Sequence, residues 1–283
     1  MSNAYQLIDF GDGLKLESLS GHLVSRPSPA AEGIRRKHPQ RWRDAHSVYH
    51  ADAKRWSHHS RWPETLSIDC GNFRMPVRPT PFGHIGLFPE QAKNWEWLSC
   101  VPQRDQLQAL NLFAYTGAST MALARAGFEV VHVDAAKPNV SAAKMAAAAN
   151  DMSDAPIRYM VDDAAKFVAR EVRRQRKYHT IVMDPPAYGH SPKGKTWRLE
   201  RDLWPLVDDC LELIDPLNFR MLITGHSPQV DASDVLEYLM RSAAIKAAQK
   251  NDRLRYKTGR SAIQDRSGRS LDAGFYLRVE SGD

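Results

Sequence analysis

Two aspartates directly follow apolar runs that are typical of buried strands. Asp134 follows residues 130–133, and Asp184 follows residues 180–183. An ionised carboxylate accepts hydrogen bonds from hydroxyl and amine groups. The first aspartate therefore suits the hydroxyls of a ribose, and the second suits the amine of a planar base.

The stretch before Asp134 reads as strand, loop, helix and strand. An apolar run ends at Phe113, Gly117 relaxes the turn, residues 119–126 continue as helix, and Gly127 stops it. In nucleotide-binding βαβ units an acid at this distance meets the ribose. The loop has one glycine where the dinucleotide fingerprint has three, which argues against a pyrophosphate and so against NAD. A cofactor with adenosine but no phosphate, such as S-adenosylmethionine, fits better; an ordinary βαβ unit with a fortuitous acid is the alternative.

The second aspartate opens the sequence Asp184-Pro185-Pro186-Ala187-Tyr188. Prolines cannot donate to a strand ladder, so the strand ends at Asp184. The carboxyl ends of parallel strands are where open α/β sheets bind ligands. Asp184 and the Pro185 carbonyl can accept hydrogen bonds from an exocyclic amine, while Tyr188 offers a face for stacking. Proline-rich turns of this kind also occur in proteins that are not enzymes.

With these motifs the chain resembles the class I S-adenosylmethionine-dependent methyltransferases, and among them the group that modifies large-subunit ribosomal RNA. The resemblance covers roughly residues 80–230, in the order that such a sheet demands. It rests on residues 83–91, 111–117, 133–135, 161–164 and 184–188.

The resemblance implies the positions that bind the cofactor. Residues matching Phe113 to Gly117 line it, Asp134 holds the ribose hydroxyls, Asp163 faces the adenine amine, and Gln91 lies near the methionine end. The full expected set is Phe88, Gln91, Asn111, Phe113, Tyr115, Thr116, Gly117, Asp134, Ala135, Asp162, Asp163, Ala164 and Asp184.

The elements that must position these residues alternate strictly between strand and helix. This alternation predicts a Rossmann-like, doubly wound α/β sheet. The expected strands are 108–113, 129–134, 157–161, 179–184 and 219–224, and the expected helices 119–126, 138–150, 164–175, 199–214 and 231–248. The resemblance adds an antiparallel edge hairpin from strands near 253–258 and 274–279.

Three parts are expected along the chain: a small, basic, β-rich domain over residues 1–78, a connector with a lead-in helix over 79–100, and the methyltransferase domain over 101–283. Within the first part, residues 5–23 predict a β-hairpin, residues 24–62 are rich in proline and histidine and read as irregular, and residues 66–75 suggest further strands.

Charge indicates a polyanionic partner. The net charge is +6, and residues 21–62 carry nine Lys or Arg against three acids, with tryptophans and histidines among them. Cations for phosphates and rings for unstacked bases are typical of single-stranded RNA binding, although a basic segment with tryptophans in a small core explains them equally well. The loop over 189–197, with Lys193, Lys195 and Trp197, and the basic segment 246–269 are further candidates for RNA contact.

Other features bound the location and the metal content. No apolar run has the length of a membrane span and no signal peptide opens the sequence, so a cytoplasmic location is expected. The three cysteines, Cys70, Cys100 and Cys210, lack metal-ligand spacing, so no metal is expected.

The chemistry depends on whether a cysteine is available. Methylating C5 of a pyrimidine normally needs a thiolate that adds at C6. Some relatives carry a cysteine in the turn after the fifth strand, whereas this chain has Thr224-Gly225-His226-Ser227 there. Cys210 falls on the apolar face of a helix and is expected in the core.

Transfer to a base nitrogen of RNA, with ribosomal RNA favoured, is therefore the leading hypothesis. Asp184, Pro185 and Tyr188 would hold the base, and His226 would relay the proton or merely satisfy backbone groups in its loop. A methyltransferase of a protein or small molecule, and a non-catalytic RNA-binding protein on this fold, remain the alternatives.

Overall fold

The structure, a computed structural model, describes residues 4–101, 107–190 and 196–282, and the chain divides into two compact units. Unit 1 comprises Met1–Lys93 with Ala262–Ala273, and unit 2 comprises Asn94–Ser261 with Gly274–Asp283. Nothing in the sequence signalled that a segment near the end of the chain packs with the N-terminal residues.

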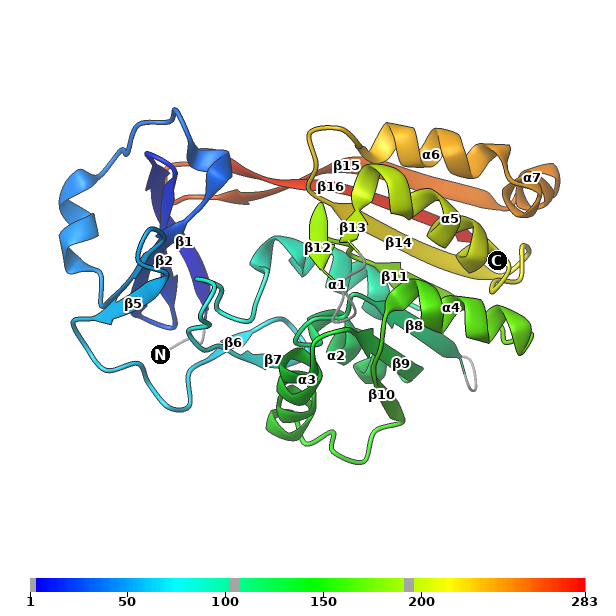
Figure 1. Ribbon diagram of the computed structural model, residues 1–283, viewed down its shortest axis with the longest axis horizontal. Helices are drawn as coiled ribbons and strands as arrows, with labels where there is room; N and C mark the ends of the chain where they lie inside the picture. The colour runs from blue at the N-terminus through cyan, green and yellow to red at the C-terminus, as the bar shows by residue number, and fades with distance from the viewer. Residues whose placement is uncertain (1–3, 102–106, 191–195, 283) are drawn as a thin grey trace. The chain divides into compact units, whose positions relative to one another are not determined.

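Unit 2 is built around a seven-stranded sheet with the order β10-β9-β8-β11-β14-β16-β15 (Figure 1). The first five of these strands are parallel, and β16 runs antiparallel to β14. The predicted doubly wound sheet with an antiparallel edge hairpin is therefore confirmed. The strands are β8 (Gln108–Leu112), β9 (Glu129–Asp134), β10 (Ile157–Val161), β11 (Thr180–Met183), β14 (Phe219–Gly225), β15 (Leu254–Gln264) and β16 (Ser270–Ser281).

Helices cover both faces of this sheet. Successive side chains of a strand point to opposite faces, so Leu110 and Leu112 of β8 join the main core while Asn111 between them faces Thr120. On the core face lie α4 (Ala164–Arg173), α5 (Leu199–Leu211), α6 (Ala232–Arg241) and α7 (Ala243–Lys250). The other face carries α1 (Ala92–Ser99), α2 (Ala118–Arg125) and α3 (Lys137–Ala149).

The direction of winding reverses between β8 and β11. From β8 the chain proceeds to β9 and β10 on one side, then crosses back to β11 and continues to β14 on the other. The loops that follow β8 and β11 therefore lead in opposite directions from the carboxyl ends of these two strands. Open sheets of this kind bind ligands at such a point.

Two predicted elements differ from the structure. The single helix expected over 231–248 is two helices, because Ser242 adopts an extended conformation (φ −72°, ψ 150°) and its hydroxyl accepts the backbone N–H of Ile245 to start α7. A serine favours this capping role over a helix interior. The edge strands are also longer than expected, because they continue from unit 2 into the segment that belongs to unit 1.

Unit 1 contains a five-stranded sheet with the order β1-β2-β3-β4-β5 and a separate hairpin of β6 and β7. The hairpin expected within residues 5–23 is confirmed as β1 and β2, and β3 extends it to a three-stranded meander. The prediction that residues 24–62 are irregular was wrong, because this stretch supplies two more strands. Strands form here despite the proline- and histidine-rich composition, because strand formation depends more on pairing with neighbouring strands than on local propensity. The strands are β1 (Tyr5–Gly11), β2 (Leu14–Leu19), β3 (His22–Pro27), β4 (Ser47–His50), β5 (Arg55–His58), β6 (Ser67–Asp69) and β7 (Arg74–Pro76).

The late segment is fixed within unit 1 by ion pairs. Arg269 pairs with the buried carboxylates of Asp9 and Asp265, and Leu271 packs with Leu7 and Phe10. Among the described residues, no helix is both long and apolar enough to cross a bilayer.

Candidate active site

The loop that follows β8 has an unusual backbone. Phe113, Tyr115 and Gly117 all have positive φ angles, of 54°, 48° and 92°. Such angles are unfavourable for an aromatic residue and persist only where surrounding contacts enforce them. The Ala114 N–H donates to the Val133 carbonyl over 3.0 Å, which ties the loop to the end of β9. A strained loop at a switch point is typical of a ligand-binding element.

Asp134 organises this loop. Its Oδ2 accepts the Tyr115 N–H at 2.8 Å, and its Oδ1 accepts the Ala136 N–H at 2.8 Å and Nδ2 of Asn139 at 3.0 Å. The carboxylate is half-buried and held in one orientation by three protein donors. Its Oδ2, which accepts only one of these bonds, can accept another from a ligand hydroxyl.

Gly117 precedes α2, and its lack of a side chain has two reasons. The positive φ favours glycine, and a Cβ at this position would lie 2.9 Å from the Cβ of Ala143 in α3. The loop can therefore approach α3 only with glycine here.

Asn111, expected at the cofactor, lies below the loop instead. Its side chain is 2% exposed, and Nδ2 donates to Oγ1 of Thr120 at 2.9 Å. Thr120 is hydrogen-bonded in turn to Nδ1 of His132 at 2.9 Å. Burial lowers the pKa of His132 to about 4, so the imidazole is neutral at physiological pH. The side chain of Asn111 thus supports the loop from within the sheet, and its contact with the cofactor stays a prediction.

The turn after β10 places two carboxylates differently. Asp162 forms an ion pair with Arg170 and also accepts the Asp163 N–H. Asp163 is the N-cap of α4, where its Oδ1 accepts the Lys166 N–H at 3.0 Å. Ala164 is the first residue of that helix and is nearly buried. Asp163 therefore keeps Oδ2 for a further hydrogen bond, whereas Asp162 is engaged by Arg170.

Asp184 follows β11, the strand beside β8. Its Oδ1 accepts the hydroxyl of Thr224, the sixth residue of β14, at 2.5 Å. Burial raises the pKa of the Asp184 carboxyl above its usual value, and the hydrogen bond from Thr224 opposes that shift. In the sequence, Thr224 stands out only as part of the turn that lacks a cysteine. A polar residue at the end of the neighbouring strand was the signal that could have identified this contact.

The rest of the acceptor turn, residues 184–188, lies near the surface. Pro185 is buried, and Tyr188 is 54% exposed at the start of the short strand β12 (Tyr188–His190). β12 pairs antiparallel with β13 (Thr196–Arg198). Lys193 and Lys195, predicted to contact phosphates, lie outside the described residues.

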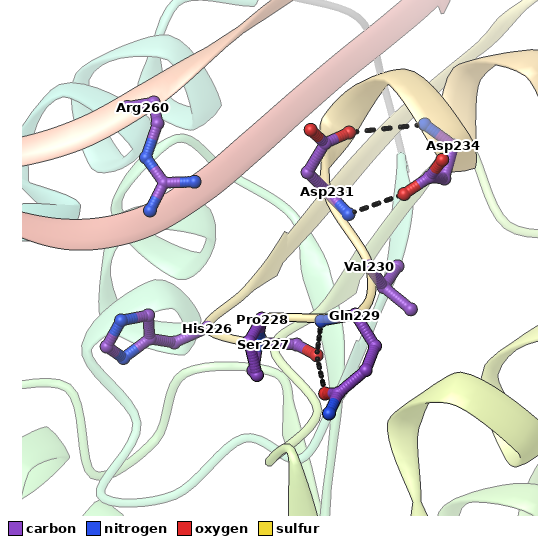
Figure 2. A pocket seen from close by; sticks show the side chains of 8 residues that line it. All are labelled: His226, Ser227, Pro228, Gln229, Val230, Asp231, Asp234 and Arg260. Atoms are coloured by element: carbon purple, nitrogen blue, oxygen red, sulfur yellow. Dashed lines mark hydrogen bonds between the residues drawn. The ribbon is translucent and has the colours of Figure 1, made fainter.

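His226 lines an open pocket of about 410 Å³ beyond the end of β14. Figure 2 shows its side chain beside the loop that leads into α6, and Arg260 of β15 also lines the pocket. The Asp231 and Asp234 carboxylates cap the start of α6. Arg260 and Gln229 were not predicted as site residues. The complete lining is His226, Ser227, Pro228, Gln229, Val230, Asp231, Asp234 and Arg260.

Two expected cofactor residues belong to unit 1. Phe88 precedes the short 3-10 helix η3 (Pro89–Gln91), and its carbonyl accepts the Gln91 N–H at 3.1 Å. Their contact with the cofactor stays a prediction.

Cys210 is fully buried in the main core, where its Sγ lies 3.8 Å from Sδ of Met183. Burial raises the pKa of its thiol far above the usual value. The prediction that Cys210 is a core residue is confirmed.

A solved structure resembles the whole chain. The SAM-dependent methyltransferase of Agrobacterium tumefaciens is 33% identical, with a TM-score of 0.88 over 99% of this chain and 91% of that one. The chain belongs to the S-adenosylmethionine-dependent methyltransferases. The cofactor of this methyltransferase is accordingly S-adenosylmethionine. A protein from Streptococcus mutans described as a SAM-dependent methyltransferase shares the fold, with a TM-score of 0.73 at 15% identity.

Curated relatives match part of this methyltransferase. They are the ribosomal RNA large subunit methyltransferases K/L of Methylococcus capsulatus, 29% identical over 53% of the chain, and of Shewanella frigidimarina, 28% identical over 38%. The matches span only 20% and 15% of those proteins' own lengths. No protein-family model matches the chain.

The residues present fit the cofactor. Asp134 and Asp163 follow the adjacent strands β9 and β10, and each keeps a carboxylate oxygen to accept from a hydroxyl or an amine. These are the groups that the ribose and adenine of the cofactor present.

Proposed function

We propose that this methyltransferase modifies a base nitrogen of RNA, with ribosomal RNA as the favoured substrate. The observation that carries the proposal is the half-buried Asp184 carboxylate, oriented by Thr224, directly after the strand that pairs with β8. An oriented carboxylate beside a methyl donor suits an amine acceptor, which must be held with its lone pair in line with the methyl group.

In this proposal Asp134 binds the ribose hydroxyls and Asp163 binds the adenine amine. The backbone from Phe113 to Gly117 lines the cofactor, and Gln91 and Phe88 approach its methionine end. Three further residues, Ala135, Asp162 and Ala164, shape the walls beside these ligands, and the Asn111 side chain supports the loop.

When bound, S-adenosylmethionine supplies an electrophilic methyl group. Asp184 and the Pro185 carbonyl accept hydrogen bonds from the target amine, which orients its lone pair, and Tyr188 stacks on the base. The cofactor would supply the methyl group to this nitrogen and would leave as S-adenosylhomocysteine. The nitrogen then gives up a proton, which Asp184 accepts and His226 relays to solvent. Because its pKa is raised, Asp184 is a stronger base than an exposed aspartate.

RNA is favoured over a protein or a small molecule for two reasons. The curated relatives act on large-subunit ribosomal RNA, and residues 21–62 of unit 1 are rich in cations and aromatic rings. A base inside a helix would have to be flipped out to reach Asp184. A cytoplasmic location, where ribosomal RNA is available, is part of the same proposal.

The test is incubation with tritiated S-adenosylmethionine and undermethylated total RNA, followed by identification of the labelled nucleoside by mass spectrometry. We expect label on a base nitrogen with wild-type protein and almost none with Asp184→Asn. Label on C5 of a pyrimidine, or label only on protein or small molecules, would refute the proposal. Retention on RNA that falls steeply as salt rises would support a polyanionic substrate.

A further inference from the structure

The indole of Trp197 contacts two loops that follow neighbouring strands. β8 and β11 pair in parallel, with Leu112 opposite Met183. Phe113 directly follows β8 and Asp184 directly follows β11, so the loop after β8 and the acceptor turn start side by side. Trp197 reaches both from β13.

On the acceptor side, Trp197 fixes the turn through its backbone. Its Nε1 donates to the Pro186 carbonyl at 2.7 Å. Two residues further on, the Leu199 N–H donates to the Ala187 carbonyl at 3.0 Å. The prolines have no N–H of their own, so the turn depends on such external donors for its position.

On the cofactor side, the indole packs against the ring of Phe113, with the ring centroids 5.0 Å apart and an interplanar angle of 57°. Phe113 is the first residue of the loop with the unfavourable positive φ. Packing against an aromatic partner is the kind of contact that holds such a backbone in place.

Trp197 itself is firmly anchored. The backbone N–H of the next residue, Arg198, donates to Oδ2 of Asp202 at 2.8 Å, and Arg201 donates to the Thr196 carbonyl. Both partners lie in the first turn of α5, which packs in the main core. The indole is therefore held by a rigid element rather than carried by the loops it contacts.

We propose that Trp197 is a positioning residue that sets the separation between the cofactor loop and the acceptor turn. This role replaces the expectation that Trp197 stacks on an RNA base. It rests on the proposed function in so far as Asp184 holds the methyl acceptor. Its physical basis is that methyl transfer requires the lone pair and the methyl group to be aligned, and a displacement of about 1 Å costs roughly 100-fold in rate.

The test compares Trp197→Phe with Trp204→Phe. The first keeps a ring against Phe113 and removes the bond to Pro186. The second removes an equivalent indole bond, from Trp204 to the Glu200 carbonyl at 2.9 Å, without touching either loop. Hydrogen exchange is followed by mass spectrometry in peptides covering residues 108–117 and 184–190, with and without S-adenosylhomocysteine.

We expect the ligand to slow exchange in both peptides of the wild type and of Trp204→Phe. In Trp197→Phe it should slow only the peptide 108–117, because the acceptor turn is uncoupled from the loop. Phe113→Leu removes the ring contact from the other side and should uncouple the turn as well. Unchanged slowing of peptide 184–190 in both Trp197→Phe and Phe113→Leu would overturn the proposal, as would its absence in the wild type.

The rates give an independent readout. In Trp197→Phe the single-turnover rate on RNA should fall about 10- to 100-fold, while the Kd for S-adenosylhomocysteine changes less than about twofold. Equal rates in Trp197→Phe and Trp204→Phe would contradict a positioning role. If the wild type methylates no RNA, the proposed function fails, but the exchange experiment still decides whether Trp197 couples the two loops.

Discussion

Replacing Asp134 by asparagine tests the cofactor site most directly. The carboxylate accepts the Ala136 N–H and the Asn139 amide through Oδ1 and the Tyr115 N–H through Oδ2. An asparagine has one acceptor oxygen, which in the best orientation keeps the two bonds at Oδ1. Its NH2 group then faces the Tyr115 N–H, and a ribose hydroxyl can no longer donate there.

The magnitude follows from the bonds that are lost. A hydrogen bond to a charged group contributes about 1.5–3 kcal/mol, so loss of the ribose bond should raise the Kd for S-adenosylhomocysteine about 10- to 150-fold. The Tyr115 N–H also loses its partner, which should cost about 1–3 kcal/mol of folding stability.

Calorimetric titration measures the affinity, and thermal unfolding without ligand measures the stability. Asp151→Asn is the matched control, because Asp151 is an exposed residue of the same unit with a positive φ that asparagine also tolerates. Wild-type affinity in Asp134→Asn would refute the assignment of this carboxylate to the ribose. Loss of affinity in Asp151→Asn as well would show that the effect is not specific.

Three further changes give distinct outcomes. Asp184→Asn should reduce methyl transfer at least about 100-fold. Because burial raises its folded pKa, the stability that Asp184 contributes is lost as pH rises through that pKa. The stability of the variant relative to that of the wild type, measured by thermal unfolding, should therefore be higher at about pH 8 than at about pH 4. Gly117→Ala should cost about 1–3 kcal/mol more in denaturant unfolding than Gly127→Ala, because both glycines have positive φ but only Gly117 has a close neighbour; equal losses would contradict the packing argument. Cys210→Ala should lower stability but leave the transfer rate within about twofold, since the thiol is buried in the core; a covalent RNA adduct that disappears with this change would contradict nitrogen chemistry.

The alternation of apolar runs with glycine and proline was enough to predict the sheet of unit 2. Its central strands β8, β11 and β14 are buried on both faces, so their residues form nearly continuous apolar runs that local sequence reveals. The aspartates after β9, β10 and β11 could be predicted for the same reason, because a polar residue marks where each strand leaves the core. Unit 1 was harder, since β4 to β7 have only three or four residues each and its polar residues are satisfied by partners distant in the sequence, as Asp9 is by Arg269.

The function of individual side chains depended on contacts between distant segments. Asn111 belongs to the expected motif, but strand alternation turns its amide inward to Thr120. Trp197 looked like part of a basic surface loop, but antiparallel pairing of β13 with β12 brings its indole to Pro186 and Phe113. No local pattern encodes either contact, because each joins residues from different elements of the fold.

The sequence by itself determined the family resemblance, the order of strands and helices, and the aspartates available for chemistry, because these follow from local periodicity and from residues at strand ends. Only the tertiary structure decided that Thr224 orients Asp184, that Arg260 and His226 line one pocket, and that one indole contacts both loops. These relations depend on which strands become neighbours in the sheet rather than on which residues follow one another in the chain.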